Sequence, residues 1–262
     1  MAHNGKYFTV EVKPTIPASK QHIGAFAVGD LLFDWTKFEI PRGGAKLVSA
    51  CVLTRPLGNA APTPNDARTS YILSSTNDLA LGTVNSEIQG SDHRPSNDFV
   101  GFFTVDEADS ASAKLNSTSI QMARDGATTN DNFSFKPFVI TPSMSASGVT
   151  PGFSEFYIAG ITQDTGMQFG QTTIRLNDAS ANMDVSVAGT TIATDGSSMD
   201  IQEHFIPGDV LHAHDDAVIG TVASVTNATD LELTSNFTAD ALADDDYVYN
   251  IHPIKLILNF EY

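Results

Sequence analysis

The chain has almost no cysteine: Cys51 is the one such residue among 262. A single cysteine excludes a disulfide within the chain, so the fold must depend on the packing of apolar side chains. The surrounding residues read AKLVSACVLTR, which predicts a strand that carries Cys51 as a small buried apolar residue. A nucleophilic cysteine would need a histidine and an orienting partner, and no local pattern supplies them.

Positively charged residues are also scarce. Lys plus Arg number 14 against 31 for Asp plus Glu, which gives a formal net charge of -17. Because phosphate contacts need clustered Lys and Arg, we expect no nucleic-acid partner. The same balance disfavours binding to an anionic membrane surface. With 41% apolar residues, the composition indicates a folded protein with a well-solvated acidic exterior.

Long apolar runs are missing as well. No stretch is long enough to cross a bilayer, and the opening MAHNGKYFTVEVK has no apolar core of signal-peptide length. We therefore expect a protein made in a cytoplasm. The sequence has no phosphate-cradling glycine loop, nucleophile elbow or zinc-protease helix. It predicts no catalytic residue, no cofactor and no enzymatic activity.

Short apolar runs separated by turn residues fill most of the chain. The last run, IHPIKLILNFEY, alternates with period two, which places Ile254, Leu256, Leu258, Phe260 and Tyr262 on one face. The other strands expected before residue 188 cover 7–12, 31–35, 45–54, 71–74, 99–105, 133–140, 153–161 and 171–176. Many short strands with few helical patterns predict a mainly β protein with a β-sandwich or jelly-roll-like main domain.

Three segments of this main domain have individual expectations. The first strand, 7–12, ends before Pro14 and Pro17 and is predicted to be an edge strand, followed by an extended arm to about Lys20. Residues 45–54 are apolar on both faces, which indicates a central strand covered on both sides. Residues 106–122, with acidic residues first and weak helical spacing, are the best helix candidate.

The composition changes after Ala188. Residues 189–250 have shorter apolar runs and more acidic residues, with strands expected at 210–212, 217–225, 230–233 and 247–250. We predict a small β-barrel inserted before the last strand. The main domain then comprises residues 1–188 and 251–262.

The segment HAHDDA in this insertion is the first candidate binding site. Alternate residues on a strand point the same way, so His212 and His214 could share a metal ion, with oxygen ligands from Asp215 and Asp216 and with His204 nearby. The alternative is a polar hairpin tip without an ion. We favour that alternative, because a metal site needs a further ligand at fixed geometry.

Two other candidates are weaker. The run Asp244-Asp245-Asp246 lacks the spaced pattern and terminal Glu of a calcium loop, which favours a solvated acidic turn. A glycan-binding platform would need aromatic residues, and Trp35 with Tyr247 or Tyr249 are the available ones. These residues fall in separate predicted domains, and Trp35 is better explained as an anchor in a core or interface.

Two stretches resemble phage proteins. Residues 29–55, GDLLFDWTKFEIPRGGAKLVSACVLTR, resemble the opening of virion structural proteins from tailed phages of marine bacteria, notably T4-like cyanophages. Residues 204–237 resemble small β modules that recur in phage structural proteins. The matching positions are Gly208, Asp209, Val210, Leu211, Ile219, Gly220, Val222, Ser224, Val225, Leu231 and Leu233.

The resemblance implies a structural role in a virion. The acidic composition favours a decoration or cement protein on the exterior of the head, which would bridge major capsid subunits and form a homo-oligomer. The expected contact elements are the arm Met1–Lys20 and the loops 58–70 and 85–98. A tail, baseplate or fibre-attachment component is the first alternative, and a glycan-binding module for host attachment is the second.

Overall fold

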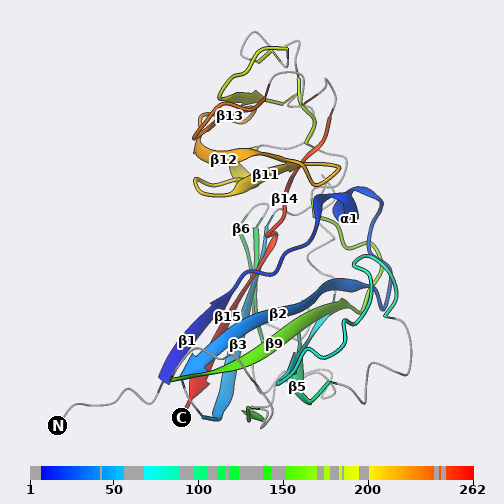
Figure 1. Ribbon diagram of the computed structural model, residues 1–262, viewed down its shortest axis with the longest axis vertical. Coiled ribbons are helices and arrows are strands. Elements are labelled where there is room, and N and C mark those ends of the chain that lie inside the picture. Colours follow the sequence, from blue (N-terminus) through cyan, green and yellow to red (C-terminus); the bar gives the residue numbers. More distant parts are fainter. Residues whose placement is uncertain are drawn as a thin grey trace, which may run out of the picture.

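The computed structural model is mainly β, with three antiparallel sheets (Figure 1). The residues that it describes are 7–41, 43–55, 68–88, 97–105, 111–115, 118–123, 138–142, 152–169, 174–177, 183–184, 186–194, 201–238, 242 and 246–262. The sheets form a larger main unit and a smaller unit, which lies at the top of the view in Figure 1.

The main unit contains one short helix and ten strands within the described residues. They are β1 (Tyr7–Val12), α1 (Ala18–His22), β2 (Leu31–Pro41), β3 (Ala45–Thr54), β4 (Thr69–Ser74), β5 (Phe99–Val105), β6 (Ala111–Leu115), β7 (Thr118–Ala123), β8 (Phe138–Ile140), β9 (Phe153–Thr162) and β15 (Ile254–Glu261). The small unit contains β10 (Thr191–Ala193), a 3₁₀ helix (Ile201–Glu203), β11 (Val210–Ala213), β12 (Val218–Val225), β13 (Asp230–Leu233) and β14 (Val248–Asn250).

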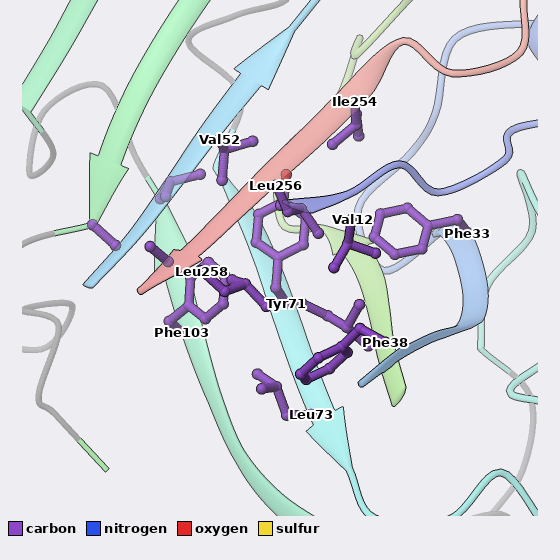
Figure 2. Close-up of a cluster of buried hydrophobic side chains, with 14 of the residues drawn as sticks. Val12, Phe33, Phe38, Val52, Tyr71, Leu73, Phe103, Ile254, Leu256 and Leu258 are labelled. Atoms are coloured by element: carbon purple, nitrogen blue, oxygen red, sulfur yellow. The ribbon is translucent and has the colours of Figure 1, made fainter. Parts of the chain in front are cut away.

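Two sheets of the main unit pack face to face. The larger has the order β1-β15-β3-β7-β6, with β8 also paired to β3, and the other has the order β2-β9-β4-β5. Figure 2 shows Val52 and Leu256 of the first sheet facing Tyr71, Leu73 and Phe103 of the second. This shared core gives the main unit the β-sandwich class that the sequence predicts.

The strand at the C-terminal end behaves as its alternation predicts. Ile254, Leu256, Leu258 and Phe260 are fully buried, while Tyr262 lies beyond the strand and is 50% exposed. β15 pairs antiparallel with β1 on one side and with β3 on the other. β1 is an edge strand of this sheet, as expected.

Four further strand predictions in the main unit are confirmed by β2, β4, β5 and β9, and β2 continues beyond residue 35 to Pro41. The strand expected at 133–140 is seen as β8, and residues 133–137 lie outside the described part. Residues 174–176 of the strand expected at 171–176 form isolated bridges rather than a named strand, and 171–173 are not described.

The prediction that 45–54 is covered on both faces is wrong for a local reason. The strand is central, but its pairing with β15 shifts register between Asn259 and Phe260. This bulge changes the phase of β3, so that Leu47 before it and Ala50 and Val52 after it all face the core. Leu47, Ala50 and Val52 therefore serve one buried face, while the apolar Cys51 and Leu53 lie on the other face, which remains partly exposed.

The helix expected over 106–122 is also wrong. Residues 111–115 and 118–123 form the hairpin β6–β7, and 106–110 lie outside the described residues. β7 pairs with β3 from Ala50↔Ala123 to Thr54↔Ser119. The helical spacing in this Ser- and Ala-rich segment was weak, and pairing with a central strand outweighs a weak local preference.

The arm expected after the first strand packs on its own chain. Ile16 is fully buried in the main core, and Ala18–His22 form α1. The described residues between 7 and 20 therefore belong to the fold and do not form a free arm; residues 1–6 lie outside the described part.

The small unit is a five-stranded antiparallel sheet in the order β10-β13-β12-β11-β14. The four strands predicted in it are confirmed by β11 to β14. Its core also includes Ile174, Leu176 and Met183, so this unit begins before the expected boundary at residue 189. The Leu176 N–H donates to the Asp246 carbonyl (2.8 Å) and the Asn177 N–H to the Ala193 carbonyl (3.0 Å), so this segment bridges both edges of the sheet.

Candidate functional site at the seam of the two units

Helix α1 forms one side of the seam between the units, against β14 and β11 (Figure 1). Gln21 is 1% exposed, and its side-chain amide donates to the carbonyl oxygens of Ile16 (2.8 Å) and Asn250 (2.9 Å). The Ile16 N–H donates to the Ile251 carbonyl at 2.8 Å. These bonds satisfy buried backbone groups from both units and fix their relative position.

Aromatic rings from both units meet beside α1. The Nδ1 of His22 lies 2.6 Å from the hydroxyl of Tyr249, and its ring lies 5.2 Å from that of His214 and 5.5 Å from that of Tyr247. Burial, with a smaller contribution from His214, lowers the pKa of His22. The neutral ring is favoured, so this part of the seam is an aromatic contact at neutral pH.

The two histidines considered as metal ligands do not face a common point. β11 ends at Ala213, so His212 is on the strand and His214 is in the following turn. His212 is buried, and its Nδ1 lies 3.0 Å from the backbone carbonyl of Asp216. The Nδ1 of His214 lies 3.8 Å from the carboxylate of Asp246.

The two candidate carboxylates have partners of their own. Asp215 accepts a hydrogen bond from the Ala217 N–H at 3.0 Å. Asp216 accepts two bonds from Ser19, at 2.9 Å from the backbone N–H and at 2.5 Å from the hydroxyl. Within the described residues, no three His, Cys, Asp or Glu side chains form a group that could hold a metal ion. In this structure Asp216 links the small unit to α1.

His204 lies in the core of the small unit. Its side chain is fully buried, and within the described residues neither ring nitrogen has a hydrogen-bond partner. Burial, assisted by the positive charge of Arg55, lowers the pKa of His204 to about 4. The ring is therefore neutral and packs as a core side chain.

A cavity of about 310 Å³ opens at the seam, on the side of β3 and β15. The described residues of its wall combine the cations Lys13, Arg55 and Lys255 with His252 and one carboxylate, Asp209. Apolar residues complete the lining: Leu53, Ile206, Val210 and Pro253. The sequence alone did not point to this site, because its residues come from four separate segments of the chain: 13, 53–55, 206–210 and 252–255. The only sequence feature that pointed toward it is the scarcity of Lys and Arg, because a place where several of them gather then stands out.

The Arg55–Asp209 ion pair joins the two units inside this cavity. The guanidinium Nη2 donates to Asp209 Oδ2 at 2.7 Å, and both side chains are largely buried. The same oxygen accepts bonds from the Ile206 N–H (3.0 Å) and from the Asn250 side-chain amide (3.3 Å). The Oδ2 of Asp209 thus accepts three hydrogen bonds from donors around the seam.

The aromatic residues proposed for glycan binding are not brought together. The Trp35 indole N–H donates to the Leu79 carbonyl at 2.9 Å, and its ring lies 5.9 Å from that of Phe99 in the main unit. Tyr249 is 1% exposed, and Tyr247 contacts His22 at the seam. A platform that combines Trp35 with these tyrosines is therefore not formed.

Cys51 lies on β3, as expected, and is partly buried. Burial raises the pKa of its thiol. A raised pKa keeps the sulfur protonated, which is the opposite of what a nucleophilic cysteine requires. Other candidates lie outside the described residues, namely 58–67 and 89–96 of the two contact loops, and Asp244 with Asp245.

Comparison with known proteins gave no match to any family model, to any curated protein or to any solved structure. In the described part of the chain, no helix has both the length and the apolar character needed to cross a membrane.

Proposed function

We propose that this chain is a non-enzymatic structural protein of a phage virion, and that it decorates the outer surface of the head. The proposal rests mainly on the position of the residues that resemble a phage β module. These residues form one continuous segment of the small unit, from the turn before β11 to the end of β13. Leu211, Val222 and Leu231 of this set are buried in its core, and Gly208 has a φ of 93° in the turn before β11.

The surface composition supports an outward position. A net charge of -17 would repel packaged DNA, whereas it keeps an exposed, densely repeated protein soluble. Two packed cores and a bonded seam provide a stable body without disulfides, as expected for a particle component assembled in a cytoplasm. The proposed role is to bridge neighbouring major capsid subunits and to add buried area where they meet.

An exposed apolar face of the main unit is suited to such a contact. On the outer side of β4 and β5, Ile72, Phe99, Val100 and Phe102 line a hollow of about 660 Å³. The Phe102 side chain is 67% exposed. Contiguous apolar surface of this kind marks an interaction site in soluble proteins.

The test is cryo-electron microscopy of intact particles that contain this chain, with the copy number and position as readout. We expect density for the chain repeated over the whole head. A few copies at the neck, baseplate or fibres would move the assignment to a tail component. Absence from every particle would overturn a virion role.

A further inference from the structure

We infer that the cavity at the seam is a binding site for an oxyanion, namely a phosphate or carboxylate group attached to a small apolar part. Three of the chain's 14 Lys and Arg residues line this one cavity, in a protein with a net charge of -17. Isolated lysines are normal on a surface, but convergence of scarce cations at a concave site is a feature of anion recognition.

The cations are only partly neutralised by their neighbours. Among the described residues, Lys255 and Lys13 share a single carboxylate, Glu11, at 2.6 Å and 3.4 Å. Arg55 has the carboxylate of Asp209. In the part of the chain that the structure describes, three positive charges therefore face two negative ones, and a bound anion would balance the excess charge. The hydrogen bond from Lys255 lowers the pKa of Glu11, so that carboxyl is ionised at neutral pH and is included in this balance.

Hydrogen-bond donors remain for a ligand. Within the described residues the side chain of Arg55 makes one hydrogen bond, to Asp209, although a guanidinium carries five N–H donors. The His252 Nδ1 donates to the Pro14 carbonyl at 3.0 Å, so the Nε2 of the neutral ring is an acceptor, and the donors available to an oxyanion are those of Arg55 and the two lysines. An oxyanion with several acceptor oxygens matches this arrangement, because arginine and lysine bind such groups by charge-assisted bonds.

The apolar residues of the lining would contact the apolar part of the ligand. Leu53 and Pro253 come from the main unit, and Ile206 and Val210 come from the small unit. A volume of about 310 Å³ is at the lower end of small-molecule sites and also accommodates an acidic side chain from a partner protein. Because both units contribute, a bound anion would also strengthen the seam.

The experiment uses the full chain, labelled with ¹⁵N, at neutral pH and constant ionic strength. Inorganic phosphate is titrated in one arm, and a peptide of consecutive glutamates, with its glutamine counterpart, in the other. We expect saturable shifts of the backbone amides of Leu53, Arg55 and Val210. Tighter binding of the glutamate peptide would identify acidic protein side chains as the source, and binding of phosphate alone would identify a free phosphate.

Two variants test whether the cavity is responsible. Lys13→Gln combined with Lys255→Gln keeps the Arg55–Asp209 pair and should weaken binding at least about tenfold. Arg55→Lys, which keeps the charge but loses the guanidinium fork, should also weaken it. The control Lys37→Gln changes a lysine of β2 that pairs with Glu39 and Glu155, and should leave affinity unchanged. Absence of saturable shifts with both probes, or equal affinity in the double variant, would overturn the inference.

Discussion

Two buried polar side chains, one at the seam and one in the small unit, differ in how many hydrogen bonds they make. The side-chain NH₂ group of Gln21 donates to two carbonyl oxygens from different parts of the chain, while its buried Oε1 has no hydrogen-bond partner within the described residues. His204 is also fully buried, and neither of its ring nitrogens has a hydrogen-bond partner within the described residues. A buried histidine that stays neutral in the folded chain makes the free energy of unfolding depend on pH, and that free energy falls as the pH falls.

The first prediction concerns acid stability. The pKa of His204 is about 4 in the folded chain against 6.5 for an unperturbed histidine. The unfolded chain therefore binds the proton more readily between these values, and stability falls as pH drops through that window. The contribution is about 2 kcal/mol near pH 5 relative to pH 8. His204→Leu should lack this loss, as measured by urea unfolding at both pH values.

The matched control is His214→Gln, which changes an exposed histidine of the same unit. Its loss of stability on acidification should stay much closer to that of the unmodified chain than to that of His204→Leu, because His204 remains and His214 makes only the smaller contribution to the lowered pKa of His22. Carboxylates contribute to acid unfolding in all three proteins and cancel in the comparison. Identical pH dependence for His204→Leu and the unmodified chain would show that His204 takes up a proton without cost.

At the scale of strands, period-two patterns were a good guide where one face is buried. β15 was predictable because every second residue from Ile254 to Phe260 enters the core. The hairpin β6–β7 was not, because its Ser- and Ala-rich sequence has little preference and its structure comes from pairing with β3. The β3 bulge was also hidden, since its pattern is the same as that of a strand buried on both faces.

The pairing of β2 with β9 supplies the second prediction. Gly160 of β9 lies under the buried ring of Phe33, and an added Cβ would overlap that ring. Gly160→Ala should therefore destabilise the chain by about 1–3 kcal/mol, because the core there has no room for a methyl group. Gly189→Ala is the control: its Cβ would lie 3.6 Å from Phe237, an ordinary contact. Denaturant unfolding that gives equal stabilities for the two variants would contradict the close packing at Phe33.

At the scale of the whole molecule, the seam could not have been predicted from the sequence. Arg55 and Asp209 are 154 residues apart, and Ser19 and Asp216 are 197 apart. No periodicity or motif relates such positions, because the contact depends on how two separately packed units dock. The HAHDDA segment was a candidate metal site because of its His and Asp side chains. In the structure its Asp216 instead accepts hydrogen bonds from Ser19 of α1.

The third prediction tests whether the Arg55–Asp209 pair couples the units. Arg55→Gln should cost about 1–3 kcal/mol, since it leaves a largely buried carboxylate without its cation. Trp35, the sole tryptophan, lies in the main unit, so its fluorescence reports that unit alone. In the unmodified chain the fluorescence and calorimetric midpoints should coincide, whereas in the variant the small unit should unfold first. The control Lys37→Gln should keep the midpoints together, and coincident midpoints in Arg55→Gln would show that other contacts couple the units.

The last prediction concerns the exposed face on β4 and β5. Phe102 is 67% exposed, so Phe102→Ser should leave the isolated chain folded and equally stable. If this face docks on the head, loss of a central aromatic side chain should reduce occupancy on particles at least about tenfold. Val218→Ser in β12 is the control, because Val218 is equally exposed but lies on the small unit. Occupancy is measured by quantitative gel analysis of purified particles. Full occupancy of Phe102→Ser on particles would exclude this face as the contact with the head. It would not affect the proposed virion role, which the cryo-electron microscopy of intact particles tests separately.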